Sequence, residues 1–294
     1  ANVDAFLSFA QFVDADLNDG NALSTTNGFR FDVTIPGSDD GFSGDITIGD
    51  LYTYYPIGAA VALAQFSGGR LIDHWEDILA NVFDPNPYRQ RGGWFLGFTR
   101  NIRFDLQLDN AAKLPLDGGR RIERVTIDDG GGPRDMDRSR IYTLASCYPH
   151  GNPIDEVCRT SGAFNTRFIA GTRETDGPAD LFGNRQLDMG RDSDAFSIRA
   201  PENSESVFDP ARSQPLVKVA PDNFVHPVDA LRWYLRDSVI TRDAHGLGRV
   251  RVTGASPDDP RRGVPESEFG GPGIVQPTQG AGPDWLTRGR RVTP

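Results

Sequence analysis

Apolar residues recur along this chain with two different periods, and that pattern limits what the chain can fold into. Helical spacing, with apolar side chains three and four positions apart, occupies residues 2–17, 70–82 and 227–240. Alternation, which is typical of half-buried strands, is clearest in "NIRFDLQL" at 101–108. Because helical and strand-like segments share the chain, we predict an α+β fold in which a mixed β-sheet packs with helices.

Further strand-like runs lie on both sides of the helix predicted at 70–82. The stretch "GDITIGDLYTYYPIGAAVALAQFSG" holds two β-rich runs around Tyr55-Pro56, and we expect a turn at Gly68-Gly69. After the helix we expect strands in "GGWFLGF", "RRIERVTIDDGGGP" and "RIYTLASCY". Between about 160 and 225 the periodicity is weak, so this part predicts loops rather than a defined element.

Glycine and proline content separates the end of the chain from the rest. From about residue 254 onward Gly and Pro are frequent, and the segment contains five acidic residues and five Arg, so no core can form there. We therefore predict one domain over residues 1–250, with a core at 2–150 plus the helix 227–240. An extended Gly/Pro-rich C-terminal tail or arm over 251–294 would follow it, available to hold a larger assembly.

Charge and motif content exclude several functions. The net charge of −10 disfavours nucleic acid as a partner, because phosphate backbones need a basic face. No run of about 18 apolar residues exists, so we predict no transmembrane segment. The sequence lacks GxSxG, HExxH and phosphate-loop motifs. It shows no charged-then-apolar leader at Ala1, and we expect any export signal to have been removed.

The two cysteines, Cys147 and Cys158, lie in "CYPHGNPIDEVC". A bend in the Gly- and Pro-containing sequence between them can bring their Cα atoms within disulfide range. A pair of structural thiols is the first alternative, and a metal site with His150 is the second, although a fourth ligand is not evident. We predict the disulfide, which favours a location outside the cytoplasm.

Acidic residues surround one conspicuous arginine. Arg30 is the only Lys or Arg in residues 1–69, a segment that carries nine Asp. It can form an ion pair with Asp32 or Asp45, or point into a cleft and hold an anion with two hydrogen bonds. The acidic stretches "DADLNDGNALST" and "DDGGGPRDMD" fit calcium loops poorly, and we expect a capped helix end and a hairpin turn there.

Three motifs occur in an order that resembles a known family. They are "TNGFRFD", then "GDITIGDLYTYYPIGAAVALAQFSGGRLIDHWEDIL", then "GRRIERVTIDDG" followed by "DRSRIYTLAS". This order is similar to the C-terminal domain of the 5′-nucleotidase / UDP-sugar hydrolase superfamily. The connector "ANVFDPNPYRQRGGWFLG" most resembles the thiosulfohydrolase branch of the sulfur-oxidation (Sox) pathway. The resemblance covers roughly residues 2–150, with a further match at 227–240.

The resemblance implies a role for the whole chain. Members of that superfamily join such a domain to an N-terminal metallophosphoesterase-like domain, which holds two divalent metals and works outside the cytoplasm, often in the periplasm. The motifs GDxxD, GNH[ED] and GHxH of that domain are absent from this sequence. We therefore expect a substrate-recognition domain that is not catalytic by itself, has no cofactor of its own, and partners a metal-bearing catalytic domain or chain. The alternative is a non-catalytic accessory subunit that serves assembly of a larger periplasmic complex.

The resemblance also assigns residues. Arg30 matches the arginine that contacts the anionic group of the substrate, and "YPIG" matches "PFGN", with Ile57 at the position of a base-stacking aromatic. That replacement argues against a nucleotide and favours a small anion. The expected substrate-binding residues are Asn27, Phe29, Arg30, Tyr55, Ile57, Gly58 and Tyr88. The expected partner surface is Arg89, Arg91 and Trp94, and we assign no catalytic or metal-binding residue.

Overall fold

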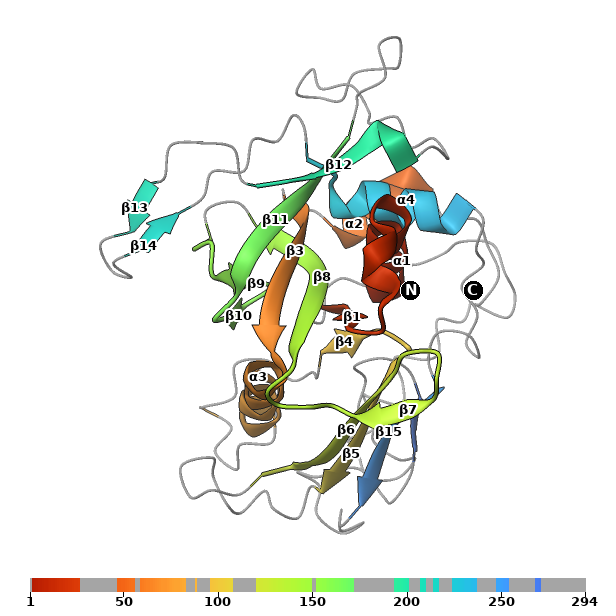
Figure 1. The fold of residues 1–294 in the computed structure, drawn as a ribbon, viewed down its shortest axis with the longest axis vertical. Coiled ribbons are helices and arrows are strands. Elements are labelled where there is room, and N and C mark those ends of the chain that lie inside the picture. Colours follow the sequence, from red (N-terminus) through yellow and green to blue (C-terminus); the bar gives the residue numbers. More distant parts are fainter. Residues whose placement is uncertain are drawn as a thin grey trace. The chain divides into compact units, whose positions relative to one another are not determined.

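The protein is described here by a computed structural model. The described residues are 2–26, 47–55, 59–82, 88, 96–107, 120–149, 152–171, 193–200, 207–209, 214–216, 224–236, 247–253 and 268–270. The chain divides into two compact units (Figure 1), the first made of residues 1–66 and 141–240, the second of 67–140 and 241–294. Each unit is therefore assembled from segments that are distant in the sequence.

A five-stranded mixed sheet forms the centre of the first unit. Its strands lie in the order β1 (Ala22–Leu23), β8 (Ile141–Pro149), β3 (Ala59–Ser67), β11 (Phe164–Gly171) and β12 (Phe196–Arg199). β1 is parallel to β8, whereas β11 is antiparallel to both β3 and β12. β3 is buried along almost its whole length, which indicates that both faces of the sheet are covered at its centre.

Helices of the first unit gather beside this sheet (Figure 1). They are α1 (Asn2–Val13), α2 (Ile48–Tyr54) and α4 (Pro227–Arg236); α1 contacts β8 and α4, and α2 contacts α4. Aromatic rings join them to the sheet: Phe9 lies 5.1 Å from Phe196 and 5.3 Å from Trp233 between ring centres. These edge-to-face pairs bury large apolar areas, so this cluster is a main source of the unit's stability.

Short elements complete the first unit. Among the described residues these are the 3-10 helices η1 (Ala15–Asn18) and η5 (Ser193–Ala195), the strand β2 (Thr25–Thr26), and the two-stranded ladders β9 (Glu156–Val157) with β10 (Thr160–Ser161) and β13 (Val207–Asp209) with β14 (Gln214–Leu216). The β9–β10 ladder follows β8 directly and carries the second cysteine in its turn.

The second unit has a sheet of its own. Its strands lie in the order β16 (Glu268–Gly270), β15 (Leu247–Thr253), β5 (Ile102–Gln107), β6 (Ile122–Asp128) and β7 (Pro133–Asp135), with only β15 and β5 parallel. The helix α3 (Gly68–Val82) and the strand β4 (Gly97–Phe98) belong to the same unit. Trp75 of α3 is buried and lies 5.1 Å from the ring of Phe104 on β5.

The α+β fold class and the mixed sheet are confirmed, and the three predicted helices are present as α1, α3 and α4. The alternation predicted at 101–108 is confirmed by β5, whose inward side chains are Ile102, Phe104 and Leu106. Strands β11 and β12 lie where the periodicity was too weak to predict them. β15 runs across the domain boundary predicted at residue 250, and that boundary stays a prediction.

Two local predictions were wrong. The β-rich run before Tyr55 is the helix α2, because Thr47 and Asp50 form a reciprocal cap that starts a helix there. The turn expected at Gly68-Gly69 is instead the first two residues of α3. Their N–H groups donate to the carbonyls of Arg140 and Arg138, at 2.9 and 2.8 Å. A Cβ on Gly69 would lie 3.2 Å from the Arg138 oxygen, so this close approach favours glycine.

Among the described helices, none combines the length and the apolar character needed to cross a membrane.

Candidate functional site

Most residues predicted to bind substrate or partner lie outside the described residues. These are Asn27, Phe29, Arg30, Ile57, Gly58, Arg89, Arg91 and Trp94. Four predicted residues are described: Tyr55, Tyr88, Cys147 and Cys158. The first, third and fourth belong to the first unit, and Tyr88 belongs to the second.

Tyr55 and Tyr88 have opposite surroundings. Tyr55 follows the last turn of α2, is 1% exposed, and its ring lies edge-on to Phe6 at 6.1 Å between ring centres. In this structure Tyr55 is therefore a core side chain. Tyr88 is 97% exposed.

Helix α2 is fixed at its start by polar side chains. The hydroxyl of Thr47 accepts from the Asp50 N–H at 3.2 Å, and the Asp50 carboxylate accepts from the Thr47 N–H at 2.8 Å. The Thr47 hydroxyl also donates to the Asp50 carboxylate at 2.7 Å, and this bond, followed by the one from the Thr47 N–H, holds the pKa of the Asp50 carboxyl below its usual value. In the sequence, α2 directly follows the segment that contains Arg30 and precedes the one that contains Ile57.

The start of α4 is positioned by the central sheet of the first unit. The Val225 N–H donates to the backbone carbonyl of Ile169 in β11, and the Val225 carbonyl accepts from the N–H of Val61 in β3, both at 2.8 Å. The next residue, His226, caps α4: its Nδ1 accepts from the Val228 N–H, and its own N–H donates to the Asp229 carboxylate, both at 3.1 Å. Because Nδ1 accepts a hydrogen bond, the neutral imidazole carries its proton on Nε2.

The rings of Tyr52 and His226 stack against each other at 6.0 Å between ring centres, with 30° between their planes. Tyr52 is 48% exposed and His226 is half-buried. We call this pair the Tyr52–His226 surface. It offers an aromatic face, a phenol and an imidazole, groups that can bind a planar or anionic ligand. Neither residue was predicted, although "HPVD" carries the signal of a helix start, with Pro at the first helical position.

The two cysteines lie close together. Both side chains are buried, and their Sγ atoms are 3.7 Å apart as two separate thiols. Burial, followed by the nearby Cys147, raises the pKa of Tyr54 in α2 to about 12. The predicted bond between Cys147 and Cys158 stays a prediction.

The acidic stretches use their carboxylates locally, as expected. Asp14 caps η1 by accepting from the Asp16 N–H at 3.0 Å. In the β6–β7 turn, the Asp129 carboxylate accepts from Arg134 at 2.8 Å and from the Gly131 N–H at 3.1 Å, and these bonds, the first above all, lower the pKa of its carboxyl. Within the part of the chain that the structure describes, no cluster of three or more His, Cys, Asp or Glu is arranged to hold a metal ion.

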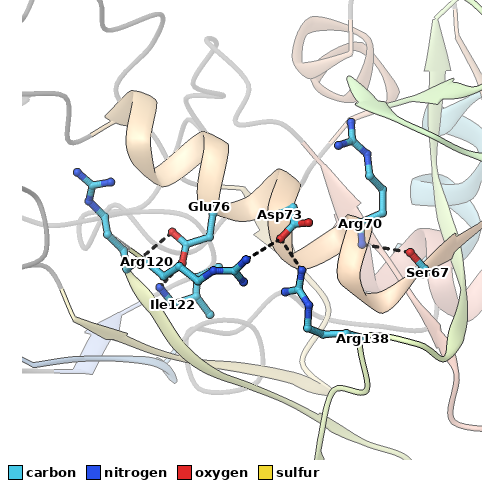
Figure 2. Close-up of polar contacts among 8 residues, drawn as sticks. Ser67, Arg70, Asp73, Glu76, Arg120, Ile122 and Arg138 are labelled. Atoms are coloured by element: carbon cyan, nitrogen blue, oxygen red, sulfur yellow. Dashed lines mark hydrogen bonds and ion pairs between the residues drawn. The ribbon is translucent and has the colours of Figure 1, made fainter. Parts of the chain in front are cut away.

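A second polar cluster lies along α3 in the second unit (Figure 2). Asp73 accepts from Arg138 at 2.6 Å and pairs with Arg120 at 3.6 Å. One turn further on, the Glu76 carboxylate accepts from the backbone N–H groups of Arg121 at 3.0 Å and Ile122 at 2.7 Å. The bonds of Glu76 attach α3 to the start of β6.

Residues 4–148 match the family described as the 5′-nucleotidase C-terminal domain. Three similar solved structures are the NAD nucleotidase of Haemophilus influenzae, a 5′-nucleotidase precursor from Thermus thermophilus, and the sulfate thiohydrolase SoxB of Thermus thermophilus. Their identities to this chain are 17%, 21% and 25%, with TM-scores of 0.32, 0.32 and 0.36.

Each alignment covers 49% of this chain and 22%, 24% and 23% of the respective structure. The chain therefore spans about a quarter of the length of these proteins. No curated protein matches the sequence significantly.

Proposed function

We propose, on the premise that residues 4–148 belong to the 5′-nucleotidase C-terminal domain family, that this chain is the substrate-recognition part of a two-domain hydrolase. That family match is the observation that carries the proposal. It agrees with the fold of the described residues, a mixed sheet packed with helices.

In this proposal, catalysis belongs to a separate metallophosphoesterase-like domain or chain. Hydrolysis at a two-metal centre needs carboxylate and imidazole ligands that hold the ions, generate a hydroxide and stabilise the displacement. The described residues offer no cluster of that kind. This chain would supply binding contacts alone, in the periplasm or another extracytoplasmic compartment.

The proposed ligand is a small anion, a sulfur oxyanion or a phosphate. Arg30 would bind it with two parallel hydrogen bonds, which the planar guanidinium favours. The Tyr52–His226 surface supports this assignment. Tyr52 belongs to α2, and in the sequence α2 lies between the segment that contains Arg30 and the segment that contains Ile57. The imidazole Nε2–H and the tyrosine phenol would add hydrogen bonds to the same anion.

Isothermal calorimetry tests the proposal with thiosulfate and with 5′-AMP as probes. We expect at least one probe to bind, and the variant Arg30→Ala to bind it about 10- to 100-fold more weakly, because a hydrogen bond to a charged group contributes roughly 1.5–3 kcal/mol. Arg103→Ala is the matched control, since Arg103 is exposed on β5 in the other unit. It should leave the affinity unchanged.

Two results would count against the proposal. Unchanged affinity in Arg30→Ala would remove Arg30 from the site. Failure of the folded wild-type chain to bind either anion would reject the recognition role. In that case the accessory-subunit alternative would gain, and it predicts that the chain co-purifies with a complex that lacks a metallophosphoesterase chain.

A further inference from the structure

Cys147 and Cys158 are brought together by two different elements of the first unit. Cys147 lies near the end of β8, and Cys158 lies in the turn between β9 and β10. Their Sγ atoms are 3.7 Å apart, close to van der Waals contact, and both side chains are almost fully buried. A disulfide needs the two sulfurs to approach to about 2.0 Å, so a small side-chain movement separates this geometry from a bond.

The backbone around Cys158 has a strained conformation. The turn residues Cys158 and Arg159 have φ of +47° and +64°, the left-handed region that a side chain with a Cβ disfavours. Two-residue hairpin turns with both φ values positive favour Asn and Gly. Neither occurs here. Strained residues persist where the surroundings hold them, and they gather at functional positions.

Hydrogen bonds fix this hairpin from both sides. The Glu156 N–H donates to the Pro153 backbone carbonyl, and the Ala163 N–H donates to the Asp155 backbone carbonyl, both at 2.9 Å. The Thr166 hydroxyl of β11 donates to the Ile154 carbonyl at 2.8 Å. The position of the Cys158 thiol against Cys147 is therefore set by the fold of the hairpin and its neighbouring strand.

We propose that Cys147 and Cys158 form an intrachain disulfide when the protein meets a disulfide oxidant, and that this bond locks the β9–β10 hairpin to the end of β8. One cysteine thiolate attacks the oxidant, a small-molecule or protein disulfide, and releases one thiol. The second thiolate then attacks the cysteine sulfur of this mixed disulfide and releases the other thiol. The oxidant gains the two electrons and two protons that the cysteines lose.

The bond has a structural consequence. It closes a short loop, and constraining that loop in the unfolded chain stabilises the folded one. Tyr54 of α2 lies within electrostatic range of Cys147, so the lock acts next to the helix that carries Tyr52. The disulfide does not require the proposed ligand, because it involves the hairpin and the two sulfurs alone.

The experiment uses the whole chain, first reduced and then incubated with oxidised glutathione. One sample is oxidised in native buffer and another during refolding from urea, so that burial cannot hide the thiols. After denaturation and alkylation with iodoacetamide, mass spectrometry counts the remaining thiols and maps the linked peptides. We expect both thiols to disappear together, the Cys147 and Cys158 peptides to be linked, and Tm to rise by roughly 5–10 °C.

The variants Cys147→Ser and Cys158→Ala should each gain at most one glutathione and show no such rise in Tm. If either variant fails to fold, the wild-type mass measurement still decides. Two alkylated thiols after both oxidations would overturn the proposal. So would glutathione attached separately to each cysteine, or a bond between two chains.

Discussion

Glu76 lies at the point where α3 meets the start of β6, and its carboxylate satisfies two backbone N–H groups at once. It is 8% exposed, so water cannot replace it easily. We expect Glu76→Ala to lower the free energy of unfolding by about 2–4 kcal/mol, because buried N–H groups left without an acceptor cost roughly 1–3 kcal/mol each. Urea unfolding measures this difference.

The neighbouring residue supplies the control for Glu76. Asp77 is exposed on the same helix, so Asp77→Ala should change the free energy of unfolding by less than about 0.5 kcal/mol. Glu76→Gln keeps one carbonyl oxygen and should fall between the two. Equal effects of Glu76→Ala and Asp77→Ala would show that the carboxylate does not hold β6 as described.

His74 predicts a dependence of stability on pH. Burial, followed by the nearby Arg70, lowers the pKa of its imidazole to about 4. Between pH 6.5 and 4 the unfolded imidazole binds a proton that the folded one does not, so stability falls as pH falls through this window. Below about pH 4 the imidazole is protonated in the folded and in the unfolded chain. The decrease in the free energy of unfolding, at most about 3 kcal/mol, is then complete.

The variant His74→Leu isolates this contribution. In the wild-type chain the imidazole Nε2 of His74 is buried without a hydrogen-bond partner among the described residues. An apolar side chain of similar size should therefore be tolerated there at pH 7. Thermal unfolding at several pH values should then show a smaller loss of stability from pH 6.5 to 4 in the variant. Parallel curves for the two proteins would contradict the lowered pKa of His74.

At the scale of elements, α2 depends on its first turn. It has seven residues, too few for a stable isolated helix, and its cap joins Thr47 to Asp50. We expect Thr47→Ala to cost about 1 kcal/mol and to speed hydrogen exchange in residues 48–54. Thr53→Ala, which removes only a bond to the Gly49 carbonyl, should leave the exchange nearly unchanged. Equal exchange rates in Thr47→Ala and wild type would rule out the cap as the cause of the helix.

The elements that the sequence predicts well have long and regular patterns. α3 and α4 bury one face, α1 is buried on most sides, and β5 alternates strictly, so their apolar spacing is sufficient to identify them. α2 was missed because Tyr and Thr favour strands, while the pair Thr47 and Asp50, spaced three apart, outweighs that preference locally. β11 and β12 depend on pairing with distant strands, which no local pattern reveals.

The same difference in scale applies to the candidate site. The closeness of Cys147 and Cys158 could be expected from the bend between them. The stacking of Tyr52 on His226 joins residues 174 positions apart (226 minus 52) and follows from the packing of α2 against α4. Tyr55 was expected to bind substrate; its side chain lies in the core, with its ring edge-on to Phe6.

At the scale of the whole molecule, the chain builds two units, each with its own sheet. It crosses between them after residues 66, 140 and 240. The match to the 5′-nucleotidase C-terminal domain family covers residues 4–148, which contribute to both units. The proposed division of labour assigns binding to this chain and hydrolysis to a metal-bearing domain elsewhere.

Hydrolysis by the chain alone is the most direct test of that division. The purified chain would be incubated with Mn²⁺ and Zn²⁺, with 5′-AMP and a cysteine S-sulfonate as substrates, and phosphate and sulfate release would be measured. The account predicts release at the rate of the buffer control, from a preparation that binds an anion in calorimetry. Release that rises in proportion to chain concentration and stops on addition of EDTA would contradict it.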